Sequence, residues 1–283
     1  MLRTLSTLST LTNSSSSRLP RHLVIGAMAL WSLLTLFGPM LAQSPRYHAF
    51  ADQRTIHGLP HAMDVLSNLG FLVAGIAGLV ALWRTRMVHV APTARCMAAV
   101  FFAGLIGCFA GSSYYHLAPD DAALVWDRLA MCVPFAGILG LAVRLACGDD
   151  AAAWLAATAM LVCGIASTLI WQHGGNMLPW AVAQGSGMLA LVGLAFVPRR
   201  SGGLHVHLGV VIGFYALAKV FELADAQVFA LDFGLLSGHS AKHLLAAAAA
   251  WPVLHALGRL RVNAATAVSP NKGTMPVGNQ QRR

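Results

Sequence analysis

Charged residues are scarce in this sequence. Only 10% of its 283 residues are Asp, Glu, Lys or Arg, whereas 57% are hydrophobic, which is far from the composition of a soluble globular domain. The five cysteines contain no CxxC pair, which argues against both a disulfide framework and a thiolate metal site. The net charge of +9 does not indicate a nucleic-acid partner, because the basic residues flank apolar runs instead of forming a basic domain.

Eight apolar runs dominate the chain. A helix of about 20 residues crosses a hydrocarbon layer of roughly 30 Å, and each run approaches or exceeds that length. The loops between the runs are short and marked by Pro, Gly or charge, which is typical of one compact bundle. We therefore predict an all-α, polytopic membrane protein without a soluble domain, with helices over residues 22–42, 65–84, 95–117, 122–146, 151–173, 179–197, 205–224 and 239–258.

The charges beside these runs differ between the two sides of the predicted bundle. If the helices alternate in direction, most of the 19 Lys and Arg lie on the N-terminal side, and most acidic residues lie on the other side. The positive-inside rule then predicts that both termini are cytoplasmic. Residues 1–21 contain no acid and are expected to be a flexible leader, a transit peptide or a signal n-region. The polar residues 261–283 predict a disordered tail.

Five polar residues interrupt the apolar runs at helical spacing. Ser112 and His116 are i and i+4 at the end of the third run, and Asp127 lies near the start of the fourth. His239 and His243 are again i and i+4, at the start of the eighth run. Residues at this spacing share one face of a helix. Because the helices alternate in direction, all five residues are expected at similar depth, although depth alone does not make the helices neighbours.

This set predicts a metal site. Three imidazoles with an open fourth position form a catalytic zinc site, in which the metal lowers the pKa of bound water to about 7. Asp127 would then transfer protons, and Ser112 would donate a hydrogen bond to the developing oxyanion. The alternative is that these residues form hydrogen bonds between helices, as polar residues in membrane bundles commonly do. A packing role, however, does not require matched HxxxH and SxxxH pairs.

Three charged residues also lie within the last two runs. Lys219 and Glu222 are i and i+3, which predicts an ion pair with either a structural role or a role in recognising an amine. Lys242 lies between the two histidines of the eighth run. We expect Lys242 to extend towards the interface instead of binding metal.

Taken together, the sequence resembles the alkaline ceramidase family, which belongs to a superfamily of seven-helix membrane hydrolases that includes the progestin and adipoQ receptors. The resemblance is greatest to the bacterial ceramidase-like branch and extends over residues 47 to 250. It rests on the segments "YHAFADQR", "DVLSNLGF", "GSSYYHLAPD", "VWDRLAM", "YALAKVFELAD" and "SGHSAKHLLAA".

The resemblance implies a seven-helix membrane domain over residues 43–260, with 22–42 as an additional N-terminal transmembrane helix. It implies Zn²⁺ bound by His116, His239 and His243, with Asp127 and Ser112 as catalytic residues. Eukaryotic members also have an acidic calcium-binding segment before the "SNL" helix. Here Asp52 and Asp64 are the only carboxylates in that region, so calcium binding is not expected.

The function implied is hydrolysis of a carbon–nitrogen amide bond in ceramide or another N-acyl membrane lipid, through attack by zinc-bound hydroxide. The alternative is a lipid-sensing, receptor-like bundle that keeps a structural zinc site. The resemblance and the short loops suggest a bacterial inner membrane with the site facing the periplasm.

Overall fold

The structure is an all-α bundle, with no strand among the residues that it describes. It is a computed structural model that describes residues 2–268 apart from 86, 87, 89 and 199–202, with side chains described within 19–262. The helices are α1 (Leu2–Phe37), α2 (Ala62–Ser67), α3 (Leu69–Arg84), α4 (Pro92–Leu117), α5 (Asp121–Cys147), α6 (Asp150–Gly174), α7 (Leu178–Ala195), α8 (Leu208–Leu223), α9 (Asp225–Leu231), α10 (Gly238–Ala248) and α11 (Trp251–Val268).

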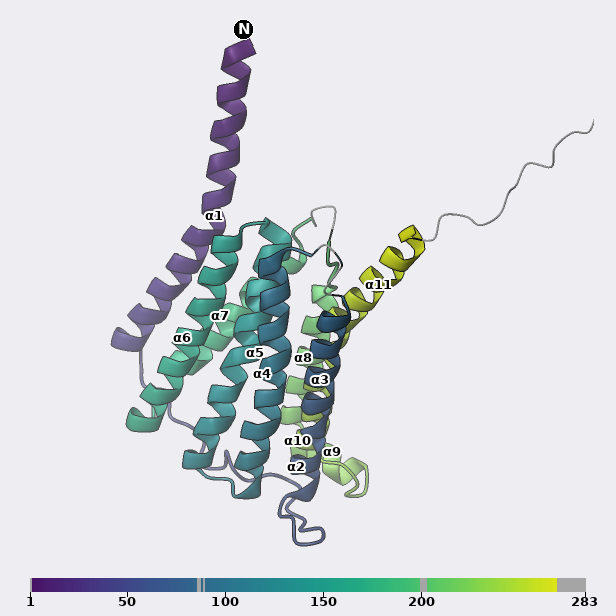
Figure 1. Ribbon diagram of the computed structural model, residues 1–283. Coiled ribbons are helices and arrows are strands. Elements are labelled where there is room, and N and C mark those ends of the chain that lie inside the picture. Colours follow the sequence, from purple (N-terminus) through teal and green to yellow (C-terminus); the bar gives the residue numbers. More distant parts are fainter. Residues whose placement is uncertain (1, 86–87, 89, 199–202, 269–283) are drawn as a thin grey trace, which may run out of the picture.

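Seven helices form a closed ring. Consecutive helices pack against each other from α3 to α8, α10 packs against α8, and α10 also contacts α3. Helix α1 lies outside this ring against α6 and α7 (Figure 1). The arrangement agrees with the predicted seven-helix core and additional N-terminal helix.

The two ends of the chain are more helical than predicted. Helix α1 begins at Leu2 and so includes the residues expected to form a flexible leader, where Gly is absent and the first Pro is Pro20. Helix α11 continues to Val268, so residues 261–268, expected in a disordered tail, are helical. That stretch contains three alanines, which favour helix. The remainder of the predicted tail, 269–283, lies outside the described residues.

Six helices in the described part of the chain are long and apolar enough to cross a membrane. These candidate spans are Leu19–Phe37, Ala62–Arg84, Pro92–Leu117, Asp121–Cys147, Asp150–Gly174 and Leu178–Ala195. The last two predicted spans do not form single long helices, because α8 has 16 residues and α10 has only 11.

Local sequence explains where helices break or end. Pro252, the second residue of α11, has no N–H for the carbonyl of Ala248, and α10 ends at Ala248. The side chains of Ser67 and Asn68 both donate to the carbonyl of Asp64, which competes with helical bonding between α2 and α3. The chain turns out of α1 at Gly38, before Pro39, where helical backbone is disfavoured.

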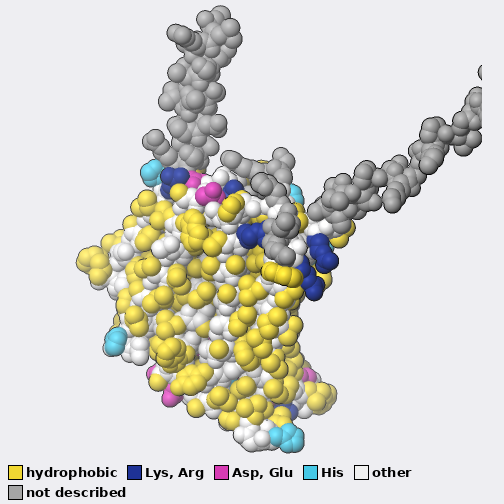
Figure 2. Space-filling view, viewed as in Figure 1, with side chains coloured by type: hydrophobic (Ala, Val, Ile, Leu, Met, Phe, Trp, Pro, Cys, Tyr) yellow, Lys and Arg dark blue, Asp and Glu magenta, His cyan; other side chains and the backbone are white. Residues whose placement is uncertain are grey.

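The surface of the bundle is apolar around its middle. Figure 2 shows hydrophobic side chains over most of this face, with Lys and Arg gathered at the end where the N-terminal part of α1 leaves the bundle. Exposed apolar side chains of this extent are unusual on a soluble monomer. We conclude that this is a membrane protein.

Candidate metal centre

Three buried imidazoles meet between α4 and α10. The His116 and His239 Nε2 atoms are 3.2 Å apart, and the ring of His243 lies 5.0 Å from that of His116 and 4.8 Å from that of His239, measured between centroids. The exposed fractions of His116, His239 and His243 are 0%, 7% and 2%. The structure therefore confirms the predicted convergence of the third and eighth apolar runs.

The geometry suits a metal ion. One nitrogen from each ring lies within 4.8 Å of the others. Two nitrogens bound at 2.0–2.1 Å to a tetrahedral ion would be about 3.3 Å apart, which is close to the separation of the His116 and His239 nitrogens. Within residues whose side chains are described, this is the one group of three or more His, Cys, Asp or Glu that could hold an ion.

Ser67 fixes the tautomer of His243. The Ser67 hydroxyl donates its single proton to the carbonyl of Asp64 at 2.9 Å, so it can only accept from the Nδ1 of His243, which lies 2.8 Å away. A proton on Nδ1 leaves the Nε2 lone pair of neutral His243 free for a metal.

Substituting Ser67 by Ala is expected to weaken metal binding without removing a ligand. Loss of such a supporting partner typically costs 10- to 100-fold in metal affinity, because the ring and its tautomer are no longer fixed. Competition titration with a chromophoric zinc chelator would measure the change. Ser186→Ala is a matched control, since Ser186 on α7 bonds only its own helix, at Ala183. Equal zinc affinities of Ser67→Ala and the wild type would contradict the role assigned to Ser67.

Asp127 and Ser112 lie together beside this centre. Ser112, one turn before His116 on α4, is buried, and its hydroxyl lies near the Asp127 carboxylate. Asp127 is also within electrostatic reach of Lys242, whose ammonium contacts His239. The structure thus brings all five predicted residues to one region. A serine hydroxyl has one proton, so Ser112 can donate to Asp127 or to an oxyanion, but not to both at once.

A phenylalanine that the sequence analysis did not consider covers the imidazoles. The Phe50 ring centroid lies 4.7 Å from that of His116 and 4.4 Å from that of His239, and Phe50 is only 6% exposed. It belongs to the loop between α1 and α2. An aromatic ring in this place excludes water from one side of the centre.

Asp225 links that loop to the ligand helix. One oxygen of its carboxylate accepts from the backbone N–H of Ala51 at 2.9 Å, and the other accepts from that of His239 at 2.8 Å. The position of Phe50 is therefore coupled to the start of α10. Nothing in the sequence pattern identifies this contact, because Asp225 acts through backbone groups of two distant segments.

The two carboxylates considered for calcium are engaged with protein groups. The Asp52 carboxylate pairs with the guanidinium of Arg54 at 2.6 Å. Burial alone would raise the pKa of Asp52, but hydrogen bonds and attraction from Arg54 outweigh it and lower that pKa. One oxygen of Asp64 accepts from the hydroxyls of Ser237 and Ser240.

Lys242 does not extend towards the interface as predicted. Its Nζ lies 3.1 Å from the Nε2 of His239 and 3.3 Å from a carboxylate oxygen of Glu222. The prediction was wrong because a side chain of this length can bend back along its helix to a group three residues away. The predicted ion pair between Lys219 and Glu222 is confirmed.

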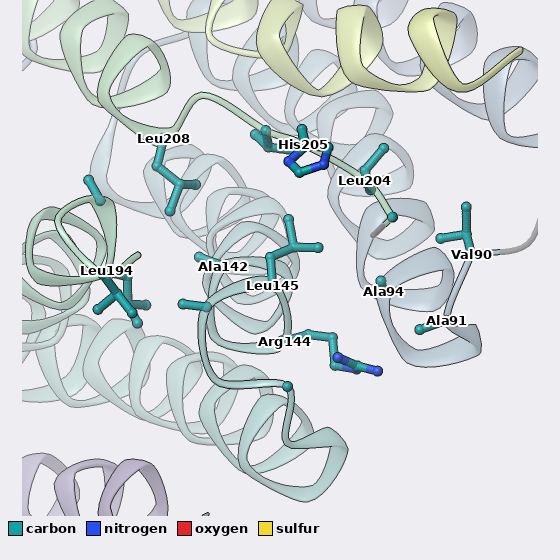
Figure 3. Close-up of a pocket in the computed structure, with 16 residues that line it drawn as sticks. Val90, Ala91, Ala94, Ala142, Arg144, Leu145, Leu194, Leu204, His205 and Leu208 are labelled. Atoms are coloured by element: carbon teal, nitrogen blue, oxygen red, sulfur yellow. The ribbon is translucent and has the colours of Figure 1, made fainter. Parts of the chain in front are cut away.

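A separate cavity of about 120 Å³ lies near the opposite end of the bundle. Figure 3 shows Leu145, Leu194 and Leu208 around it, with His205 and Arg144 as its polar members. Arg144 forms an ion pair with Asp150. Among the described side chains, no group of three or more His, Cys, Asp or Glu that could hold an ion lies at this cavity.

No protein-family model and no curated protein sequence matches this chain. Its function is therefore inferred from the residues and from the geometry of the histidine centre.

Proposed function

We propose that this protein is a zinc-dependent hydrolase that cleaves an amide bond of a membrane lipid, like the alkaline ceramidases that its sequence resembles. The observation that carries the proposal is the meeting of three buried imidazoles with the Asp127–Ser112 pair inside an apolar bundle. Ionisable groups inside a membrane protein are costly and usually functional.

His116, His239 and His243 would hold the ion. Imidazoles without thiolates suit zinc, and three protein ligands leave one position for water or substrate. When bound, zinc supplies Lewis acidity towards a carbonyl oxygen and makes a water nucleophile available near neutral pH.

Asp127 would carry the proton. In amide hydrolysis the water oxygen bonds to the carbonyl carbon, the carbon–nitrogen bond breaks, and one proton passes from the water to the leaving nitrogen. A carboxylate beside the reacting centre takes up this proton and then delivers it.

Ser112 would donate its hydrogen bond first to Asp127 and then to the oxyanion. While Asp127 is ionised, it holds the Ser112 proton through a charge-assisted hydrogen bond. Once Asp127 is protonated, it accepts less strongly, and the hydroxyl can turn towards the oxyanion. This order reconciles the proximity of Ser112 to Asp127 with the role expected from the sequence.

The apolar belt and the charge distribution suggest where the reaction takes place. A site within the bundle is reached from the membrane, which fits an N-acyl lipid as substrate. The concentration of basic residues at the N-terminal end favours cytoplasmic termini and a site facing the periplasm of a bacterial inner membrane.

The test is hydrolysis by purified, zinc-loaded protein of a panel of N-acyl lipids and matched ester lipids in detergent. Release of fatty acid and free amine from an N-acyl lipid is expected, and it should stop after chelation and return with added zinc. Zinc-loaded protein that cleaves no lipid of the panel would overturn the proposal. A ligand that binds and changes the conformation without turnover would instead identify a lipid sensor.

A further inference from the structure

A cavity of about 300 Å³ lies between α11 and the segment that precedes α8, at the end of the bundle opposite the metal centre. Its polar lining consists of three imidazoles and one guanidinium, those of His205, His207, His255 and Arg259. The volume is at the lower end of the range for ligand-binding pockets. The cavity is therefore large enough for a small ligand or a lipid headgroup, but not for a whole lipid.

Local structure brings the four polar side chains together. Residues 204–207 are extended, so alternate side chains point to opposite sides. The two apolar residues of this segment are buried, whereas His205 and His207 are exposed on the other side. On α11, His255 and Arg259 are i and i+4 and so share one face of the helix. The two pairs line the same cavity, and Figure 3 shows the His205 ring beside the yellow ribbon of α11.

The cavity is not suited to a metal ion, although it has three histidines. Among the described side chains, the one group whose ligand atoms could share an ion is that of the metal centre. His205, His207 and His255 therefore do not converge on one point. In addition, the guanidinium of Arg259 would repel a cation bound beside it.

No carboxylate balances Arg259. All ten acidic residues of the chain have described side chains, and none of them lines this cavity. Two lie at this end of the bundle, and both are paired: Asp149 with Arg21, and Asp150 with Arg144. The other eight belong to the opposite end, where α4 and α8 end and α5 begins. They are Asp52, Asp64, Asp120, Asp121, Asp127, Glu222, Asp225 and Asp232.

We propose that this cavity binds a phosphate group. The guanidinium of Arg259 matches two phosphate oxygens with two parallel N–H groups, and each imidazole offers at least one N–H donor whether it is neutral or charged. His207 precedes α8 and makes no side-chain capping bond, so the positive end of that helix adds to the attraction. Membrane orientation accounts for basic residues at this end, but it does not require that three imidazoles and a guanidinium surround one cavity.

The phosphate could belong to the headgroup of an anionic lipid or to a soluble phosphate compound, because both present the same oxygens. The test is calorimetric titration of the full-length, zinc-loaded protein in uncharged detergent at constant ionic strength. The probes are inorganic phosphate and dihexanoyl phosphatidic acid, and saturable binding of at least one is expected. Tighter binding of phosphatidic acid by about tenfold or more would identify a lipid headgroup site, whereas similar affinities would identify a site for soluble phosphate compounds.

Arg259→Gln should lower the affinity for the better probe by about tenfold or more, the usual effect of losing a hydrogen bond to a charged group. Arg259→Lys keeps the charge but not the paired donors, and should bind with intermediate affinity. Arg261→Gln is the matched control, because Arg261 is an exposed residue of the same helix that does not line the cavity. This control removes the same charge and should change the affinity less than about twofold.

Equal losses of affinity in Arg259→Gln and Arg261→Gln would refute the inference, because they would show general attraction to a basic surface. Failure of the wild type to bind either probe would refute it as well. Loss of binding in His239→Ala, with Arg259→Gln unaffected, would place the phosphate at the metal centre instead of this cavity. Binding that depends on Arg259 in a protein that cleaves no lipid would support the phosphate site independently of the proposed hydrolase.

Discussion

Substituting His239 by Ala is expected to remove zinc from the purified protein. The wild type should contain about one zinc per chain, because three imidazoles converge as in a three-histidine site. The variant keeps His116 and His243 only. Since loss of a mere supporting partner already weakens binding 10- to 100-fold, loss of a ligand should weaken it by more than about 100-fold. Elemental analysis after dialysis against a weak chelator measures the ratio.

His239→Ala tests zinc ligation without unfolding the protein, because α10 should tolerate alanine at this position. Alanine is the strongest helix former, and the bond from Asp225 to residue 239 uses the backbone N–H, which the variant retains. His173→Ala is the control, since His173 is exposed near the end of α6. Zinc retained by folded His239→Ala, at the wild-type ratio, would remove His239 from the ligand set and with it the basis of the proposed function.

Substituting Asp127 by Asn is expected to slow lipid hydrolysis by roughly 10²- to 10⁴-fold, the usual contribution of a positioned acid–base group. Asparagine has nearly the same shape, and its carbonyl oxygen can still accept from Ser112, but it cannot take up a proton. Zinc content should stay at the wild-type ratio, because none of the three imidazoles is changed. The measurement is the initial rate of amine release from the best substrate of the lipid panel.

Asp121→Asn is the matched control for this variant. Asp121 lies on the same helix, but its side chain is 72% exposed and pairs with His48 instead of the centre. Lipid hydrolysis by Asp121→Asn should remain within about threefold of the wild-type rate if Asp127 is the group that transfers the proton. Lipid hydrolysis by zinc-loaded Asp127→Asn at the wild-type rate would refute the role of Asp127 as the proton carrier.

Much of the helical architecture follows from hydrophobicity along the chain. Each of the eight predicted runs is largely helical in the structure, because an apolar segment of this length has to satisfy its backbone polar groups internally. The interruptions at Asn68 and between Ala248 and Trp251 were not predicted. They depend on a proline and on side chains that bond to the backbone, which hydropathy does not detect.

The metal ligands could be predicted because they obey two simple regularities. His239 and His243 share a helix face at i and i+4, and alternating helix direction places His116 at the same depth. The partners of the ligands obey neither rule. Phe50 and Asp225 reach the centre from a loop and from the start of α9, and Lys242, expected to extend towards the interface, instead contacts Glu222 on α8.

The sequence by itself determined the membrane class, the approximate helices and the candidate ligand residues, since these depend on composition and spacing within single segments. Only the tertiary structure decided that α4 and α10 are neighbours, that Ser67 sets the His243 tautomer, and that Lys242 on α10 meets Glu222 on α8. Those contacts depend on how seven helices close into a ring. Packing among distant segments, not spacing along one of them, brings such groups within hydrogen-bonding distance.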